Sequence, residues 1–207
     1  NHIQGQFFAD ITKEVFLDLE DGKYQYTEPR ISIYGRSQDE WNNLASWFVD
    51  HKVYSKNARW MIQIPRWDDM YRKKEDGIKN FAEMLANIFK PIFEATINPI
   101  KHPKLARVLE NISGFDSVDD ESKAELIGRY DELPTANNWT NQRNPPYVYY
   151  NYYIYANIAS LNKLRKAKGL NLFDYRPHCG EAGSPVHLSS SFLCAKNISH
   201  GLVLRKA

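Results

Sequence analysis

Residues 145–180, PPYVYYNYYIYANIASLNKLRKAKGLNLFDYRPHCG, are the clearest indication of fold class because they join a helix to a strand. The helix is predicted to restart after the two prolines and to end at Gly169, behind lysines and an arginine that favour a helix C-terminus. Residues 170–180 then predict a strand. The tyrosines of 147–155 are predicted to pack this helix on the sheet, the alternative being a stacking platform for nucleic-acid bases.

The same alternation of helix and strand runs along the rest of the chain. Helices are predicted over 6–21, 37–48, 76–95, from 104 and from 188, and strands over 24–35, 58–66, 114–118 and at the C-terminal end to 204. Ser37 and Glu40 form a capping-box pattern that opens the second helix, and Pro91 is expected to kink or split the third. Residues 123–146 predict an ordered surface loop.

Strands separated by helices predict parallel pairing through about five β/α units. Polar residues gather at the predicted strand ends: Glu28 and Arg30, Gln63 and Arg66, Asp116 with Asp119 and Asp120, His178 with Glu181, and Ser199 with His200. Barrel enzymes carry their active sites at the C-terminal ends of parallel strands. The pattern therefore favours an α/β fold that is a partial (β/α)8 TIM barrel over an open doubly wound sheet. We expect residues 1–207 to be part of a single catalytic barrel domain without an internal boundary.

The composition is that of a globular protein, since 43% of the 207 residues are hydrophobic and 25% are charged. A net charge of +2 gives no support for nucleic acid or a membrane as a partner, and no apolar run approaches the ~20 residues of a membrane span. Two cysteines without framework spacing fit reduced thiols in a cytoplasmic protein. Because the chain starts without methionine and stops without a polar tail, we expect an internal piece of a longer protein.

Two side chains near residue 180 could carry chemistry at neutral pH. His178 follows a proline at a predicted strand end, where a neutral imidazole can be a metal ligand. Glu181 would point into the same cleft if the chain turns at Gly180, and there it could be a general acid or base. His200 ends the next strand, and neighbouring strands lie about 4.8 Å apart, so both histidines can face one cavity. The alternative is a rim histidine beside a glutamate that faces water.

Other candidate metal ligands are weaker. Zinc takes three or four protein ligands, so the missing ones are expected outside this chain. His51 and His102 are predicted on the surface, and His187, in a loop after Pro185, is a weak candidate. The acidic residues Asp116, Asp119, Asp120 and Glu121 favour a solvated turn over a cation site. Asp116, nearest the strand, is the one of these expected to face the cavity.

The stretches RPHCGEAG, NISHGLVLRK, FDSVDDESK, IFEATINP, and EPRISIYGRS with EW after it together resemble the AMP deaminase family. This family belongs to the adenosine deaminase group of zinc-dependent, amidohydrolase-like barrels. The resemblance covers nearly the whole chain and weakens only through about 123–138. The other zinc-deaminase design uses H-x-E and P-C-x-x-C, which are not present, so Cys179 and Cys194 are not expected to be ligands.

The resemblance implies hydrolytic deamination of AMP to IMP and ammonia, with one zinc ion (Zn2+) per site. By the family motif, His178 would be a zinc ligand and Glu181 would protonate the purine ring nitrogen next to the carbon under attack. His200 would orient and deprotonate the water that the metal acidifies. The resemblance also implies a homo-oligomer, typically a tetramer.

By resemblance, this chain supplies strands two to six of the barrel. The family's H-x-H pair, its Asp-Asp pair and its phosphate-binding lysine segment would then lie outside it. An open five-strand piece would leave apolar edges exposed, so we expect the polypeptide alone to be inactive and prone to aggregation. The alternatives are a catalytically inactive scaffold and an adenosine-type deaminase, and the intact set of His178, Glu181 and His200 speaks against the scaffold.

Overall fold

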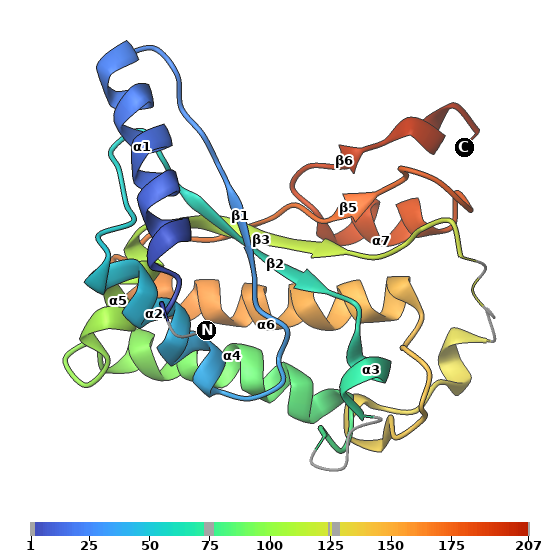
Figure 1. Cartoon of the computed structure of the whole chain (residues 1–207). Helices are drawn as coiled ribbons and strands as arrows, with labels where there is room; N and C mark the ends of the chain where they lie inside the picture. The colour runs from blue at the N-terminus through green and yellow to red at the C-terminus, as the bar shows by residue number, and fades with distance from the viewer. Residues whose placement is uncertain (1–2, 73–76, 124, 126–128, 207) are drawn as a thin grey trace.

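The computed structural model describes residues 3–72, 77–123, 125 and 129–206, and it shows a mixed α/β fold in which helices alternate with parallel strands (Figure 1). The helices are α1 (Gln6–Gly22), α2 (Asp39–Asp50), α3 (Asp68–Arg72), α4 (Phe81–Ile97), α5 (Pro103–Glu110), α6 (Tyr147–Ala167) and α7 (His187–Cys194). The strands are β1 (Arg30–Ser32), β2 (Trp60–Pro65), β3 (Ile112–Val118), β4 (Asp174–Tyr175), β5 (His178–Cys179) and β6 (Ser199–His200). Three short 3-10 helices are η1 (Tyr130–Glu132), η2 (Ala136–Asn138) and η3 (Leu202–Lys206).

Strands β1 to β4 form a parallel sheet in chain order, and β5 and β6 form a second parallel pair. A backbone hydrogen bond from Arg176 N to Phe115 O (2.8 Å) continues the pairing with β3 past the end of β4. β4 and β5 are therefore two parts of the strand predicted over 170–180, interrupted at Pro177, which has no N–H to donate. The predicted parallel α/β architecture is confirmed, and closure into a barrel stays a prediction.

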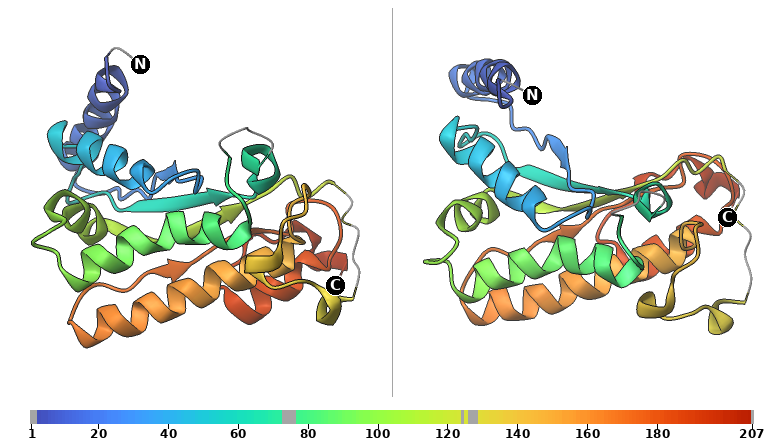
Figure 2. Two further views of the ribbon diagram at one scale, coloured as in Figure 1. Left: turned by 90° about the horizontal axis from the view of Figure 1, so that it is seen from below. Right: turned by 60° about the horizontal axis from the view of Figure 1, so that its bottom comes forward.

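The helices α4 and α6 lie side by side along one face of the four-stranded sheet (Figures 1 and 2). Phe81 of α4 stacks on Tyr150 of α6, with ring centroids 5.4 Å apart. Tyr147 and Tyr150 are fully buried, so the prediction that the tyrosines of this helix pack in the core is confirmed for these two. Tyr152, on the opposite side of the helix, is 57% exposed.

β3 and β4 approach each other closely at Gly114. A Cβ atom at this position would lie 2.3 Å from the carbonyl oxygen of Asp174, far inside van der Waals contact. The chain that leads to His178 can lie against β3 only because residue 114 has no side chain.

The capping box predicted at Ser37 and Glu40 is wrong. α2 begins at Asp39, and no side chain caps its first turn. The Glu40 carboxylate instead accepts hydrogen bonds from the backbone N–H groups of Tyr34 (2.7 Å) and Gly35 (2.9 Å). Because Gly35 adopts a left-handed conformation (φ 76°), this carboxylate closes the turn that follows β1.

The third predicted helix begins later than its hydrophobic pattern indicates, since α4 starts at Phe81 and residue 76 lies outside the described residues. Its N-cap is Asn80, whose side chain accepts a hydrogen bond from Glu83 N (2.9 Å). Pro91 does not split the helix, which continues to Ile97 with the proline buried.

The first and last predicted strands are shorter in the structure. The first keeps only Arg30–Ser32 of the predicted 24–35. The last ends at His200, because His200 and Gly201 have φ values of 73° and 65° and turn the chain into η3 before residue 204. In the predicted loop 123–146, η1 and η2 are the regular elements of the described part, and residues 124 and 126–128 lie outside it.

The first helix, α1, confirms the prediction over 6–21 and projects away from the sheet (Figure 1). Ala9 and Phe16 are buried, but Phe7, Ile11 and Leu17 are 68%, 45% and 61% exposed. This helix therefore carries apolar side chains on a surface that the described residues do not cover. Within the described ranges, no helix combines the length and the apolar character that crossing a bilayer would require.

Candidate functional site

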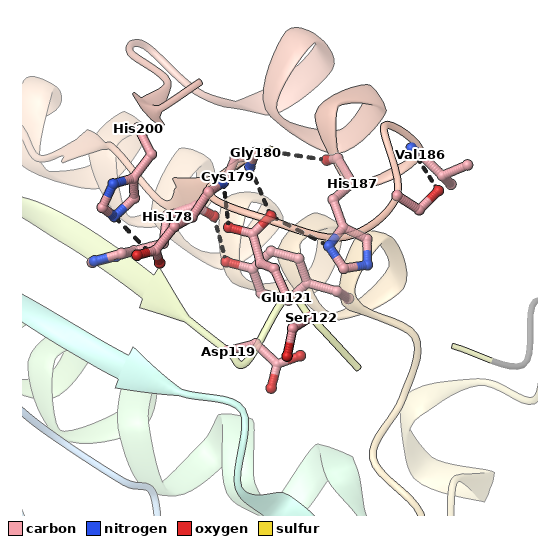
Figure 3. Close-up of polar contacts among 12 residues, drawn as sticks. Asp119, Glu121, Ser122, His178, Cys179, Gly180, Val186, His187 and His200 are labelled. Atoms are coloured by element: carbon pink, nitrogen blue, oxygen red, sulfur yellow. Dashed lines mark hydrogen bonds and ion pairs between the residues drawn. The ribbon is translucent and has the colours of Figure 1, made fainter. Parts of the chain in front are cut away.

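The two predicted strand-end histidines lie next to each other. β5 and β6 pair in parallel with Cys179 opposite His200, and the rings of His178 and His200 have centroids 5.0 Å apart (Figure 3). His200 has a left-handed backbone, which is uncommon for a residue other than glycine. The prediction that both histidines come together at the ends of neighbouring strands is confirmed.

Asp116 of β3 contacts both the backbone and the imidazole ring of His178. Its side chain is fully buried, and its Oδ1 atom is 3.0 Å from the backbone N of His178 and 2.9 Å from the ring atom Nδ1. Its Oδ2 atom accepts hydrogen bonds from Arg30 Nε (2.7 Å) and Gln63 Nε2 (3.3 Å). The hydrogen bond to Asp116 raises the pKa of His178, although burial acts in the opposite direction.

This contact orients the imidazole of His178. A carboxylate at Nδ1 accepts the N–H of that nitrogen, which leaves Nε2 as the nitrogen with a lone pair. Histidines that bind metals usually have such a carboxylate or carbonyl partner on the other ring nitrogen. The pair formed by His178 and Asp116 therefore has the arrangement that a metal ligand needs.

Glu181 lies beside the second histidine, as predicted. Its Oε2 atom is 3.7 Å from His200 Nε2, and its side chain is 55% exposed. The chain turns at Gly180, which has φ 73°, and this turn brings Glu181 to the same side as the two histidines. A carboxyl group and an imidazole this close together can both exchange protons with one small substrate that lies against them.

The interpretation of residues 116–121 as a solvated acidic turn is wrong for Asp119 and Glu121, while Asp116, the one expected to face the site, contacts His178. Asp116 is fully buried, Asp119 has 7% of its side chain exposed, and Glu121 has 1%. Asp120 is the exception, with 50% of its side chain exposed. Asp119 pairs with the buried Arg66, so the turn after β3 is an ion-pair network and not a solvent-facing loop.

His187, the weak candidate for a metal ligand, lies in a buried ion-pair network. It is buried between Glu121 (Nδ1 to Oε2, 3.4 Å) and Glu125 (Nε2 to Oε2, 3.4 Å). Burial alone would lower the pKa of His187, but the two carboxylates outweigh it and raise this pKa to about 9. Both ring nitrogens of His187 therefore face carboxylates, and the raised pKa favours its protonated form; Figure 3 shows the contact with Glu121.

Sequence reasoning missed Glu121 and His187 because their roles depend on a contact between residues 66 positions apart. The one sequence signal was the position of Glu121 just beyond a strand whose end carries polar residues. Its burial and its hydrogen bonds to the neighbouring strand could not be read from that position.

The thiols take no part in the site. Cys179 is buried, its Sγ donates to the carbonyl oxygen of His187, and burial raises the pKa of this thiol to about 11. Burial also raises the pKa of Cys194. Thiolates bind metals, and neither cysteine is a thiolate near neutral pH.

A complete metal site is not formed by the described ranges alone: they contain no group of three or more histidine, cysteine, aspartate or glutamate side chains placed to hold one ion. His178, with Nδ1 held and Nε2 free, fits the role of one ligand in a larger set.

Comparison with known proteins agrees with this geometry. The family model described as AMP deaminase matches residues 1–207. The chain belongs to the AMP deaminase family. It is 56% identical over 207 residues to AMP deaminase 3 of Mus musculus, 55% identical over 207 residues to AMP deaminase 1 of Rattus norvegicus, and 53% identical over 206 residues to AMP deaminase of Saccharomyces cerevisiae.

These matches take in 100% of the chain but only 27%, 28% and 25% of the three AMP deaminases. The chain therefore spans about a quarter of the length of its relatives. The family resemblance carried by motifs such as RPHCGEAG is confirmed.

Proposed function

We propose that the complete protein containing this chain catalyses the hydrolytic deamination of AMP to IMP and ammonia. The observation that carries the proposal is the cluster of His178, Glu181 and His200 at the ends of neighbouring parallel strands, in a chain of the AMP deaminase family. The proposal includes a (β/α)8 barrel to which the described strands contribute. It also includes a homo-oligomer, with a tetramer as the expected state, and a cytoplasmic location.

A zinc ion fits one part of this site. His178 would hold it through Nε2, and Asp116 would keep the ring in the required orientation. Further ligands would come from residues other than those described here. When bound, zinc supplies the Lewis acidity that lowers the pKa of a water molecule toward neutrality.

His200 and Glu181 then carry out the proton transfers. His200 accepts a proton from the attacking water at its imidazole nitrogen, as a C–O bond forms at the purine carbon that bears the amino group. Glu181 donates a proton to the adjacent ring nitrogen, which neutralises the charge that develops on the ring. The protonated His200 then gives its proton to the amino group as the C–N bond breaks and ammonia leaves, and the new hydroxyl group passes its proton to the Glu181 carboxylate as the C=O bond of IMP forms, so that AMP and water become IMP and ammonia and both side chains are restored.

The experiment that tests these roles is the substitution Glu181→Gln in the complete protein. Glutamine keeps the shape of the side chain but cannot donate the proton, so kcat for AMP should fall by roughly 10²- to 10⁴-fold, the range attributed to one general acid or base. Zinc content should stay that of the wild type. Glu110→Gln is the matched control, because Glu110 ends α5, before β3 begins, and its carboxylate pairs with Arg107.

The possible outcomes separate the proposal from its alternatives. Loss of zinc in Glu181→Gln would show that the glutamate is a ligand and not the acid. Turnover of adenosine with a kcat/KM equal to that for AMP would indicate an adenosine-type deaminase. A complete, zinc-loaded wild-type protein that turns over neither compound would indicate a scaffold.

A further inference from the structure

The backbone that carries Glu181 is held by a second glutamate. Glu121, in the turn after β3, accepts hydrogen bonds from Gly180 N (2.7 Å to Oε2) and from Glu181 N (3.3 Å to Oε1). Both oxygens of one carboxylate therefore bind consecutive N–H groups of the loop 180–183. Hydrogen bonds to an ionised acceptor are stronger than those between neutral groups. Burial would raise the pKa of Glu121, but its partners outweigh burial and lower it, which keeps the carboxylate ionised.

The same loop also lies directly on the backbone of residue 121. Gly183 has φ +73°, and a Cβ atom there would lie 1.8 Å from the carbonyl oxygen of Glu121. No other residue type fits this contact without moving the chain. The loop that presents Glu181 is thus fixed at its start by the side chain of Glu121 and at its end by the main chain of the same residue.

Glu121 is itself held in place from two sides. His187, the first residue of α7, lies 3.4 Å from the Glu121 carboxylate and bridges it to Glu125. Glu125 in turn accepts a hydrogen bond from Tyr147 N at the start of α6 (2.9 Å) and pairs with the buried Arg66. The Glu121 carboxylate is therefore linked to α7 directly, and through His187 and Glu125 to α6 and to the end of β2; Figure 3 shows its contact with His187.

We propose that Glu121 is a positioning residue, which places the carboxyl group of Glu181 against the substrate by fixing the backbone of loop 180–183. This inference rests on the proposed role of Glu181 as the acid. In the part of the chain that the structure describes, no hydrogen bond or ion pair joins Glu121 to His178 or His200, and Glu121 acts through the N–H groups of Gly180 and Glu181. Displacement of a catalytic group by about 1 Å can lower a rate by about 10²-fold.

The test uses Glu121→Ala and Glu121→Gln in the complete protein, with AMP as substrate. Glu121→Ala should lower kcat by about 10²-fold, since the loop loses both acceptors, with a KM within about threefold of wild type and an unchanged zinc content. Glu121→Gln should recover most of this loss, because its amide oxygen can still accept the N–H of Gly180. Asp120→Ala is the matched control in the same turn and should leave kcat within about twofold, because the side chain of Asp120 is half exposed and its contacts within the described residues are with its neighbours Ser122 and Lys123.

A double-mutant cycle separates positioning from a general structural role. If Glu121 acts through Glu181, then Glu121→Ala should lower kcat by less than about threefold when Glu181 is already glutamine. The same 10²-fold loss in both backgrounds would overturn the inference. So would an unchanged kcat in Glu121→Ala, or a loss of equal size in Asp120→Ala.

Amide hydrogen exchange gives a readout that does not depend on turnover. The N–H groups of Gly180 and Glu181 should exchange at least about tenfold faster in Glu121→Ala than in wild type. In the variant, the loop can open without breaking hydrogen bonds to the Glu121 carboxylate. Equal exchange rates would overturn the inference even if activity fell. If Glu181→Gln kept full activity while exchange in Glu121→Ala accelerated as expected, the proposed role of Glu181 as the acid would fail, and the role of Glu121 in holding the loop would stand.

Discussion

Asp116 is the side chain on which the geometry of the site depends most. Its buried carboxylate accepts four hydrogen bonds. One comes from Arg30, one from Gln63, and two from the backbone and the ring of His178. A buried carboxylate is costly unless such partners surround it. The partners of Asp116 come from segments far apart in the chain. The orientation of His178 therefore depends on the alignment of β1, β2 and β3.

Asp116→Asn should therefore weaken zinc binding in the complete protein. Asparagine is neutral and presents one acceptor, so the ring of His178 loses its charged partner, and loss of such a partner typically lowers metal affinity by about 10- to 100-fold. Competition with a chelator measures the affinity. Asp120→Asn, in the exposed part of the neighbouring turn, is the control and should bind zinc as the wild type does. Equal affinities for Asp116→Asn and wild type would contradict the role of Asp116.

His187 predicts a pH dependence of stability. Its folded-state pKa of about 9 lies above the ordinary value of 6.5, so its ion pairs with Glu121 and Glu125 contribute fully below pH 6.5 and are lost as the pH rises through 9. The tyrosine ring of Tyr147 and the thiol of Cys179 also face this residue and stay neutral across that window. The contribution is on the order of 3 kcal/mol, at 1.36 kcal/mol for each unit of pKa.

Urea unfolding at pH 6.5 and at pH 9.5 measures this effect. The free energy of unfolding should fall between the two values in the wild type and fall much less in His187→Gln. His51→Gln, at the end of α2, controls for the loss of a histidine elsewhere. A wild type with the same stability at both pH values would show that His187 is not held as a cation.

At the scale of the element, two capping patterns in this chain have different outcomes. Asn80 and Glu83 form a working N-cap for α4, whereas the similar pattern at Ser37 and Glu40 forms none. The Glu40 carboxylate is used by the turn at Gly35, five residues earlier in the chain, and the helix begins two residues after the serine. The capping pattern alone cannot distinguish the two cases, because the competing donors lie just before it in the chain.

The two positions make a matched pair for mutagenesis. Asn80→Ala should lower the free energy of unfolding by about 1 kcal/mol, the typical value of an N-cap side chain. Ser37→Ala should change it by less than about 0.5 kcal/mol, as is usual for an exposed surface substitution. Urea titration of both variants beside the wild type gives the comparison. An equal cost at the two positions would mean that Ser37 caps α2 in solution.

The order of the helices other than α3 was predictable, from an apolar face with the helical period in α4 and from the flanking prolines and the basic C-terminal end in α6, whereas the short α3 was not predicted. Strand lengths were less predictable. Pro177 interrupts the fourth strand, and the left-handed residues His200 and Gly201 end the last one early, although the residues after them are apolar and suit a strand. These are local backbone effects that outweigh side-chain patterning.

At the scale of the whole molecule, part of the site was predictable and part was not. His178 and His200 could be paired from sequence because parallel strands place their ends at one edge. The buried network of Arg66, Glu121 and His187 could not be predicted, because a charged residue is expected on the surface unless the partners that would neutralise it in the interior are known. Those partners come from the turn after β3, the end of β2 and the start of α7, which only the fold brings together.

The 207-residue polypeptide expressed alone should self-associate. Its α1 exposes Phe7, Ile11 and Leu17, and the open edges of β1 and β6 offer unpaired backbone groups. Sedimentation at increasing concentration should show a rising average mass, and Phe7→Ser with Leu17→Ser should reduce it. A monodisperse monomer at all concentrations would contradict the expectation.

The close approach of Gly114 to Asp174 has a consequence at the level of the gene. Any missense change in the codon for residue 114 adds a side chain, and the first atom of that side chain already overlaps the carbonyl oxygen of Asp174. No allele with a different amino acid at this position keeps the strand of His178 in place. In saturation mutagenesis of the complete protein, scored by the proposed deamination of AMP, this codon should therefore accept synonymous changes alone.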